Sequence, residues 1–218
     1  MRFLTILSAV CLLLLTGIAM AIEEPEFNII EQHEDYDIRQ YEPYLVAEVA
    51  VNEPFKKAGN TAFGILADYI FGANTSATKM AMTAPVESQD MDSGTRMKMT
   101  APVLSSQEAQ EEESYRYAFV IERRYDLDSV PKPIDERINL RMTQARTVAV
   151  RRYSGSWSQS NYEKYRAELM SALQRDGIET IGQSYLARYD APFVPWFLRR
   201  NEVIVEVVPE SATGISSE

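Results

Sequence analysis

The stretch from Lys79 to Leu104 contains the same five residues twice, and this repeat constrains the fold more than any other part of the chain. The two copies are KMAMTAPV at residues 79–86 and RMKMTAPV at residues 96–103. In each copy methionine alternates with other residue types, which is the periodicity of a β-strand. Each copy has a proline near its end, which lacks an amide hydrogen and belongs at a strand end, a bulge or a sheet edge. We therefore expect a long-looped hairpin of two structural strands that close a barrel.

The methionines of the two copies would lie on one face of this hairpin. Methionine most often fills irregular gaps in a hydrophobic core, but such a face could also form an adaptable apolar wall for a flat ligand. Ligation of iron by a thioether is a third, weaker alternative. The residues concerned are Met80, Met82, Met97 and Met99.

Residues 1–21 have the features of a secretory signal peptide. Arg2 is followed by a nearly uninterrupted apolar run from Phe3 to Ile18, and Ala19-Met20-Ala21 is a small-x-small cleavage site. We expect cleavage after Ala21 and a periplasmic or secreted protein. An uncleaved anchor is the alternative, although an apolar run of about 16 residues is short for a bilayer span.

Cysteine usage and charge limit the possible sites and partners. The only cysteine, Cys11, lies inside the leader, so the exported chain has no thiol for a disulfide or a thiolate metal site. The chain has 32 acidic and 22 basic residues, a formal net charge of -10, and no basic cluster. This charge argues against a nucleic-acid surface and against anionic membranes. We expect a monomer, no nucleic-acid partner and no membrane insertion of the mature chain.

The first half of the mature chain predicts strands, a helix and a further strand. Alternating residues predict strands in FNII (27–30), YDIRQY (36–41) and LVAEVAV (45–51). Asn52 is a typical helix cap, and an acid and a proline follow it in the first turn. Apolar residues then recur at helical spacing until Gly72, which we expect to end the helix. After the repeated segments, SYRYAFVIERRY predicts another strand.

The second half repeats this order. Residues 137–143 and 147–153 alternate, and we expect these two segments to pair with each other as strands. Ser158 or Ser160 can cap a second helix, which we expect to end at Gly177. The segment SYLARYDAPF, a proline-bearing turn and the last strand, NEVIVEVV, follow. We expect the polar residues 211–218 to form a disordered tail.

Residues 45–121 and 147–208 share the order strand, helix, strand, strand, which indicates two βαββ units. One such unit leaves a sheet face uncovered, so we expect two units to form one curved antiparallel sheet with a helix against each half. The expected fold class is α+β, with one domain from residue 22 to residue 210. The natural binding place would be a groove between helix and sheet.

The sequence offers few candidate catalytic groups. No serine or cysteine nucleophile has a credible base, and no HExxH, CxxC, P-loop or GxGxxG motif occurs. The single histidine, His33, lies in a polar turn and is expected to be solvated. Glu202 and a tyrosine could form a hydrolytic pair, but an outward carboxylate paired with Arg199 or Arg200 is the favoured interpretation. We expect no enzyme and no metal site.

Five segments together resemble the SOUL haem-binding family. They are YDIRQY at 36–41, LADYIFGAN at 66–74, the twin MTAPV, YSGSW at 153–157 and YDAPFVPWFLRRNEV at 189–203. The resemblance covers nearly the whole mature chain in order. It implies a curved antiparallel β-barrel of two βαββ repeats with two flanking helices, similar to effector-binding domains of the gyrase-inhibitory type.

The function that this resemblance implies is non-covalent binding of haem or another porphyrin in an apolar cleft beside the first helix. Carried over residue by residue, the cleft positions are Asn60, Phe63, Gly64, Ala67 and Tyr189.

This chain departs from its relatives at two kinds of position. Some relatives have a histidine, proposed as an iron ligand, in the YxIRxY segment, where this chain has Gln40. Basic residues that could meet haem propionates in other relatives correspond to Asn60, Asp68 and Val194. The resemblance therefore implies a flat apolar ligand more directly than it implies haem.

Other classes of function remain open from the sequence. A small-molecule hydrolase, or a binder of another hydrophobic ligand, could use the same barrel; the hydrolase would need a buried glutamate and tyrosine facing the groove. A structural envelope protein would instead fill the groove with its own side chains.

Overall fold

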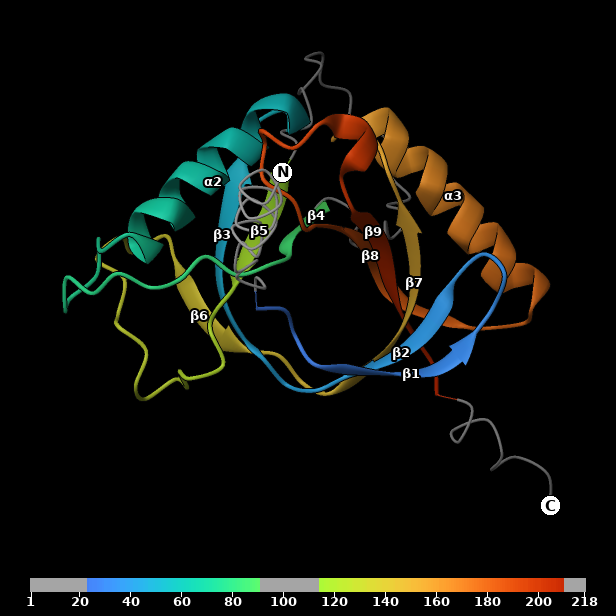
Figure 1. The fold of residues 1–218 in the computed structure, drawn as a ribbon, viewed down its shortest axis with the longest axis horizontal. Helices are drawn as coiled ribbons and strands as arrows, with labels where there is room; N and C mark the ends of the chain where they lie inside the picture. The colour runs from blue at the N-terminus through green and yellow to red at the C-terminus, as the bar shows by residue number, and fades with distance from the viewer. Residues whose placement is uncertain (1–22, 91–113, 210–218) are drawn as a thin grey trace, which may run out of the picture.

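The computed structural model describes residues 23–90 and 114–209 of the chain. These residues form nine β-strands, two α-helices and a short 3-10 helix (Figure 1). In chain order the elements are β1 (Phe27–Gln32), β2 (Asp37–Tyr41), β3 (Leu45–Asn52), α2 (Phe55–Ile70), β4 (Val86–Asp90), β5 (Ser114–Val120), β6 (Asn139–Met142), β7 (Arg146–Tyr153), α3 (Gln159–Arg175), β8 (Thr180–Arg188), η1 (Trp196–Leu198) and β9 (Asn201–Val207). The strands form one antiparallel sheet in the order β1-β2-β7-β9-β8-β4-β5-β3-β6.

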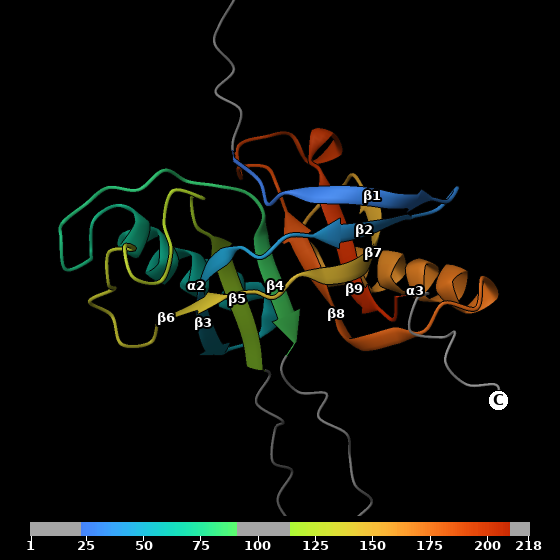
Figure 2. The same cartoon turned by 90° about the horizontal axis from the view of Figure 1, so that it is seen from below.

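Two copies of one βαββ unit make up most of this sheet. The first unit is β3, α2, β4 and β5, and the second is β7, α3, β8 and β9. The units join where β4 pairs with β8, which lie side by side at the centre of the molecule (Figure 2). The sheet is curled, and one helix flanks each half of it (Figure 1). The expected α+β fold with two repeats and two flanking helices is confirmed.

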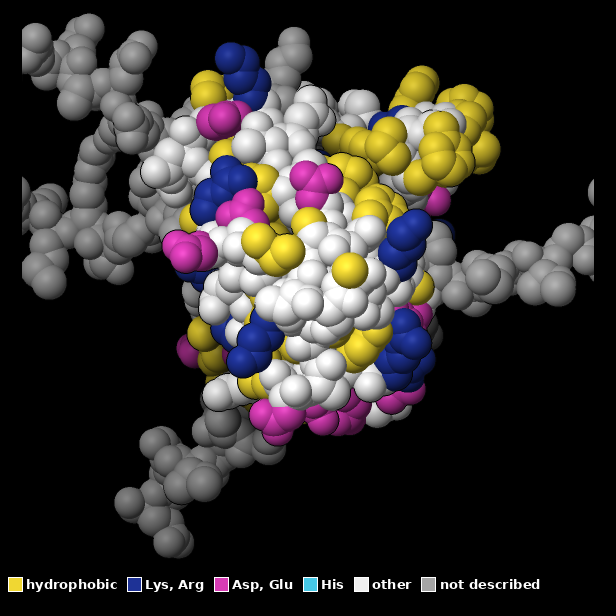
Figure 3. Space-filling view, turned by 90° about the vertical axis from the view of Figure 1, so that its left-hand side faces the viewer, with side chains coloured by type: hydrophobic (Ala, Val, Ile, Leu, Met, Phe, Trp, Pro, Cys, Tyr) yellow, Lys and Arg dark blue, Asp and Glu magenta, His cyan; other side chains and the backbone are white. Residues whose placement is uncertain are grey.

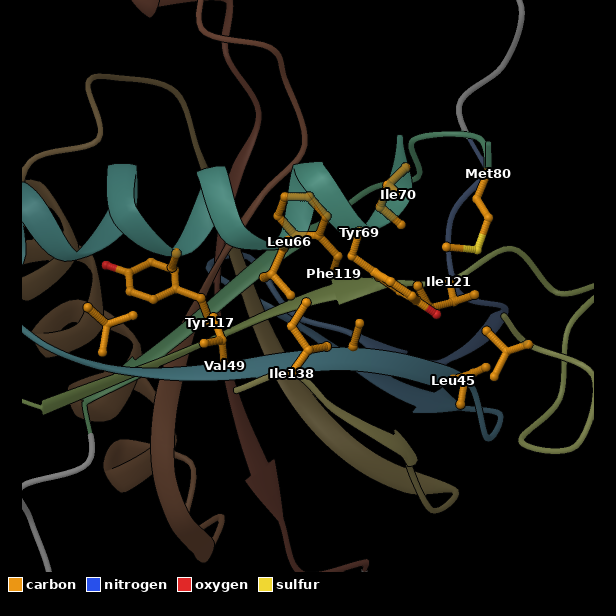
Figure 4. Close-up of a cluster of buried hydrophobic side chains, with 14 of the residues drawn as sticks. Leu45, Val49, Leu66, Tyr69, Ile70, Met80, Tyr117, Phe119, Ile121 and Ile138 are labelled. Carbon is orange, nitrogen blue, oxygen red and sulfur yellow. The ribbon is translucent and has the colours of Figure 1, made fainter. Parts of the chain in front are cut away.

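Helix α2 packs on β3 and β5 through one stripe of apolar side chains (Figure 4). Ala58 and Ala62 let the helix approach the sheet closely, and Leu66 and Tyr69 fill the space farther along it. The Tyr69 hydroxyl donates to the carbonyl of Pro131 at 2.7 Å. This bond ties the C-terminal half of the helix to the connection that follows β5.

Asn52 does not cap α2, contrary to our expectation. It is the last residue of β3, where it pairs with Ser114 and accepts a hydrogen bond from the Ser114 hydroxyl. Because the sheet uses Asn52, the helix begins only at Phe55 and has no side-chain cap. The expected end is confirmed: Gly72 has a φ of 119°, a conformation that favours glycine.

Helix α3 packs on the second half of the sheet through Leu169 and Leu173. Its first turn is capped as expected, since the Ser158 hydroxyl accepts a hydrogen bond from the Asn161 amide at 3.3 Å. Gly177 follows its last turn with a φ of 71°. Both predicted ends of this helix are therefore confirmed.

The first MTAPV copy is not a strand, so this prediction is wrong. Residues 79–85 are irregular, β4 begins only at Val86, and both edges of β4 are taken by β5 and β8. The Met80 amide donates to a carbonyl of α2, and the Met80 side chain is buried in the core under that helix. The residues of this segment are therefore held one after another by contacts with neighbouring elements. They do not form the backbone hydrogen-bond ladder of a strand. The second copy, with Met97 and Met99, lies outside the described residues.

Residues 137–143 and 147–153 also do not pair with each other, contrary to our expectation. β6 pairs with β3, whereas β7 pairs with β2 and β9. The short connection between them carries the chain from one half of the sheet to the other, and the Thr143 amide donates to the Tyr44 carbonyl at 2.8 Å on the way. Local alternation predicts a strand but carries no information about its partner.

The sheet face opposite the helices curls inward, and we call it the inner face. Its apolar part includes Val46 of β3, Val148 of β7 and Ile204 of β9, which pack together although they come from both repeats. Tyr44 and Tyr185 belong to the same cluster. Several charged side chains share this face, and they form two separate networks.

Candidate functional site

The first network of the inner face is centred on Glu202. Its side chain is 0% exposed, and its carboxylate accepts hydrogen bonds from the Tyr189 hydroxyl at 2.6 Å, from Arg39 at 3.1 Å and from Arg200 at 3.2 Å. The expectation of an outward carboxylate is wrong, because the alternation of β9 places Glu202 and Ile204 on the same inner face. The pairing with Arg200 is confirmed.

This arrangement leaves Glu202 closed to a substrate. Two guanidinium groups and one phenol occupy its acceptor sites, and burial raises the pKa of Tyr189 well above its ordinary value, so the phenol stays a neutral donor. All of these partners belong to the protein itself. The buried Glu and Tyr that a hydrolase would need are thus present, but they bond to each other and to arginines.

The second network lies in the middle of the inner face. The Tyr44 hydroxyl donates to Glu87 at 2.7 Å, and Arg146 donates to both Tyr44 and Tyr185. Burial raises the pKa of Glu87 above its ordinary value. A cavity of about 250 Å³ adjoins this network, which is below the range of about 300–1,000 Å³ usual for pockets of drug-sized ligands. Its lining also includes Glu48, Arg116, Arg141 and Glu206.

Four of the five positions that the resemblance implies lie together on α2. Asn60 and Gly64 are exposed, Phe63 is 39% exposed, and Ala67, on the same helix, is buried. Phe63 stands edge-on to Phe119 of β5, with ring centroids 5.3 Å apart, so its ring is held in place while one side faces solvent.

The fifth position, Tyr189, lies elsewhere. Its ring is buried in the inner cluster, with its hydroxyl on Glu202 and the Arg200 guanidinium 3.7 Å from its centroid. These contacts place Tyr189 on the opposite face of the sheet from α2. The structure therefore groups the helix positions and gives Tyr189 a separate, internal set of partners.

The segment after Tyr189 carries exposed aromatic side chains that the sequence analysis did not single out. Phe193 is 89% exposed, and three residues of η1 are more than half exposed (Figure 3, upper right). Arg199 fixes this segment, since it donates to the carbonyls of Val194 at 2.8 Å and Pro192 at 2.6 Å. The run PFVPWFL was the available signal: it is apolar but too interrupted by proline for a strand or a long helix. The exposed residues are Phe193, Trp196, Phe197 and Leu198.

Trp157 connects this aromatic segment to α2. The Trp157 indole donates to Asn201 at 2.9 Å, which joins the YSGSW and RRNEV motifs. The Arg199 guanidinium lies 4.2 Å from the centroid of the Trp157 ring, and the Arg188 guanidinium lies 5.5 Å from it. A Cβ placed on Gly59 of α2 would lie 3.5 Å from Arg188 Nη1. The contacts thus run from the aromatic segment to α2, one turn before Phe63.

We call the outer surface joined by these contacts the interhelical site. In Figure 1 the beginnings of α2 and α3 both lie above the sheet, and Figure 2 shows η1 set apart from both helices. The site consists of Gly59, Asn60, Phe63, Gly64, Trp157, Arg188 and Arg199 together with the exposed residues of the aromatic segment.

A larger cavity of about 640 Å³ lies at the other end of α3 and includes Gln40. Gln40 accepts a hydrogen bond from the Thr147 hydroxyl at 2.7 Å. The charged residues of its lining, Glu31, Asp176 and Glu179, are all acidic, which disfavours a ligand with carboxylates.

His33 lies beside this cavity, in the turn between β1 and β2. Its ring stacks on Tyr36 with centroids 4.3 Å apart, and Nε2 is 3.1 Å from the Glu31 carboxylate. It also faces Asp176, just past the C-terminal end of α3. Because α3 has 17 residues, this end is about 25 Å from the N-terminal end at the interhelical site. Within the described part of the chain, no three potential metal ligands cluster.

Comparison with known proteins identifies a family and a shared fold. A family model described as SOUL heme-binding protein matches residues 22–206. Heme-binding protein 2 of Homo sapiens is 28% identical over 192 residues, which cover 85% of this chain and 86% of the human protein. The C-terminal domain of EcmrR is 11% identical, with a TM-score of 0.58 over 79% of this chain and 96% of that one. A hydrolase from Listeria innocua is 8% identical, with a TM-score of 0.50 over 82% and 94%. At these identities, each of the two solved structures shows only that this chain shares its fold.

Proposed function

The chain belongs to the SOUL heme-binding protein family, and from this membership we propose that it binds haem or another porphyrin non-covalently at the interhelical site. The observation that carries this placement is the exposure of aromatic side chains on two segments, Phe63 on α2 and the run from Phe193 to Leu198, which the contacts of Trp157 connect. Exposed apolar patches of this kind on a soluble domain mark binding surfaces. A porphyrin is a flat, largely apolar molecule, so it is suited to an exposed apolar surface of this kind.

The expected affinity follows from the apolar area that a porphyrin would bury. At about 25 cal/mol per Å², covering a few hundred Å² supplies several kcal/mol, so binding near micromolar Kd requires no coordinate bond. The rings at the site are held in place: Phe63 by Phe119, and Trp157 by Asn201. Fixed rings lose little conformational freedom on binding, which favours affinity.

The site holds the porphyrin without a histidine ligand. His33 is the only histidine of the chain, and it lies at the far end of α3. Gln40, at the position of the histidine of some relatives, bonds to Thr147 beside the acidic cavity. The residues present therefore suit a porphyrin as a flat apolar ligand, and any donor to a bound iron would be a weak oxygen or thioether group.

A binding role without catalysis is also part of this proposal. The hydrolase alternative depends on Glu202 and a tyrosine, and both partners are occupied in the closed inner network. The likeness to a Listeria hydrolase concerns the fold and transfers no activity to this chain.

The proposal is tested by titrating the purified protein with haem and following the Soret absorbance. Phe63→Asp should raise Kd at least about tenfold, because a carboxylate against the ring loses apolar contact and must be desolvated. The matched control is Phe71→Asp, which changes an exposed phenylalanine just past the end of the same helix. This control and His33→Ala should leave Kd and the spectrum unchanged. Equal weakening by Phe63→Asp and Phe71→Asp, or loss of the Soret shift in folded His33→Ala, would place the ligand elsewhere.

A further inference from the structure

Arg188 differs from Arg39 and Arg200, two arginines that reach into the inner face, in having no acidic partner in the described part of the chain. It lies near the end of β8 on the helix-covered face, between Trp157 and Gly59. By contrast, Arg39 and Arg200 on the inner face both bond to Glu202. Among residues 23–90 and 114–209, no carboxylate forms an ion pair with Arg188, and its interacting neighbours are the phenols of Tyr117 and Tyr153.

Three buried polar atoms around this position have no hydrogen-bond partner within the described residues. They are Nε of Arg188 and the hydroxyls of Tyr117 and Tyr153. Buried polar groups are almost always paired, so unpaired groups that cluster require a physical reason. Here the two phenols lie beside the guanidinium that carries the third atom, on the helix-covered side of the sheet.

The electrostatics of this cluster favour an anion. An arginine stays charged, and burying its charge without a counter-ion is unfavourable. Desolvation lowers the pKa of Arg188, and burial raises the pKa of Tyr153 to about 12, so its phenol stays protonated at neutral pH and can donate. The guanidinium can only donate, and each phenol can donate as well as accept, so the cluster offers several donors but no negative charge to balance the cation.

We propose that Arg188, Tyr117 and Tyr153 form an anion subsite that binds a carboxylate of the ligand, while the Trp157 ring and Phe63 contact its apolar body. The inference rests on the proposed porphyrin function, and the carboxylate is then a propionate. Porphyrin propionates lie at the edge of a flat apolar ring, which matches a cation one helical turn from an exposed phenylalanine. Arg188 thus supplies from β8 the positive charge that Asn60, Asp68 and Val194 do not.

The test compares haem with haem dimethyl ester, in which both carboxylates are blocked and the ring is unchanged. Each is titrated into the wild-type protein and into Arg188→Met, with thermal unfolding as the check of folding. We expect the wild type to bind haem about tenfold more tightly than the diester, as one charged hydrogen-bonded contact would give. In Arg188→Met this ratio should fall to about one, mainly through weaker binding of haem.

The matched control is Arg152→Met, which removes an exposed arginine from β7 on the opposite sheet face and should keep the wild-type ratio. A wild type that does not discriminate, or an Arg188→Met protein with the wild-type ratio, overturns the subsite while leaving porphyrin binding intact. If Arg188→Met does not fold, Arg188→Lys takes its place, because lysine lacks the planar donor fork of arginine. A reduced ratio of haem affinity to diester affinity in this variant supports the subsite, and an unchanged ratio overturns it. If neither compound binds the wild type, the porphyrin function itself fails, and the subsite with it.

Discussion

Thr83 shows how one hydroxyl holds a segment that has no regular structure. It is buried, and its hydroxyl donates to the carbonyl of Val120 at the end of β5. The irregular MTAPV segment therefore attaches to the sheet through a side chain, where a strand would have used its backbone. Nothing in Met, Thr, Ala, Pro or Val is a competent acid or base at neutral pH, so we retain the structural interpretation of this motif.

Thr83→Val should lower the free energy of unfolding by about 1 to 2 kcal/mol, because the isosteric methyl leaves the Val120 carbonyl without this donor. Chemical denaturation of the variant measures this difference. Thr75→Val is the control: Thr75 is exposed, and such substitutions change stability by no more than about 0.5 kcal/mol. Equal stability of the two variants would argue against the structural role. Thr100 of the second copy should behave like Thr83, but it lies outside the described residues.

At the scale of elements, helix α2 combines two tasks on opposite sides. One side packs into the core through Ala58, Ala62 and Leu66, and the other presents Asn60, Phe63 and Gly64 to solvent. Its attachment to the core sets the position of the proposed binding surface. Tyr69 adds a buried polar contact to this packing, because its hydroxyl donates a hydrogen bond to the Pro131 carbonyl.

The pKa of Tyr69 predicts an alkaline weakening of this attachment. Burial raises the pKa of Tyr69 to about 12, against about 10 in the unfolded chain. Because the folded pKa is the higher one, the stabilisation is fully present below pH 10 and is lost as the pH rises from 10 to 12. A shift of about two units corresponds to about 2 to 3 kcal/mol over this range.

Tyr69→Phe isolates this contribution. At pH 8 the variant should be less stable than the wild type by about 1 kcal/mol, because the Pro131 carbonyl loses its donor. Between pH 10 and 12 the difference in stability between the two proteins should shrink and then change sign. The wild type loses stability in this range, whereas phenylalanine does not titrate. Urea denaturation at pH 8, 10 and 11.5 measures both proteins, and a gap that stays constant with pH would contradict the argument.

At the scale of the whole molecule, the net charge and the apolar N-terminal run bear on where the protein works. The net charge of -10 and the surface aromatic segment fit a protein that meets a small ligand in solution. Within residues 23–90 and 114–209, no helix is long and apolar enough to span a membrane. We propose that the chain is exported and acts as a periplasmic or secreted protein.

Export predicts a specific mature mass. The apolar run that ends in Ala19-Met20-Ala21 should direct cleavage after Ala21, so the exported product should begin at Ile22. Intact-mass measurement of the secreted or periplasmic fraction checks this, and Ala21→Tyr, which blocks the small-residue site, is the control. An exported wild-type product that retains residues 1–21 would contradict the prediction.

The sequence by itself determined most of the elements and their order, with the strand expected at the first MTAPV copy as an exception. Periodicity, Ser158, Gly72 and Gly177 located both helices to within a few residues, and the repeated order predicted two βαββ units. These features are local, since side-chain alternation and glycine conformation act within a few residues of the chain. The lone histidine and the lone cysteine likewise limited the possible ligands before any fold was known.

Only the tertiary structure decided what lies beside what. Closure of the sheet turned Glu202 inward, kept β6 and β7 apart, and placed Tyr189 on the inner face, away from the helix positions with which it was grouped. It also brought Gly59, Trp157 and Arg188, which are far apart in the chain, into one site. The physical reason is that strand partners and the sidedness of a curled sheet depend on contacts between distant segments, and local residue patterns do not encode them.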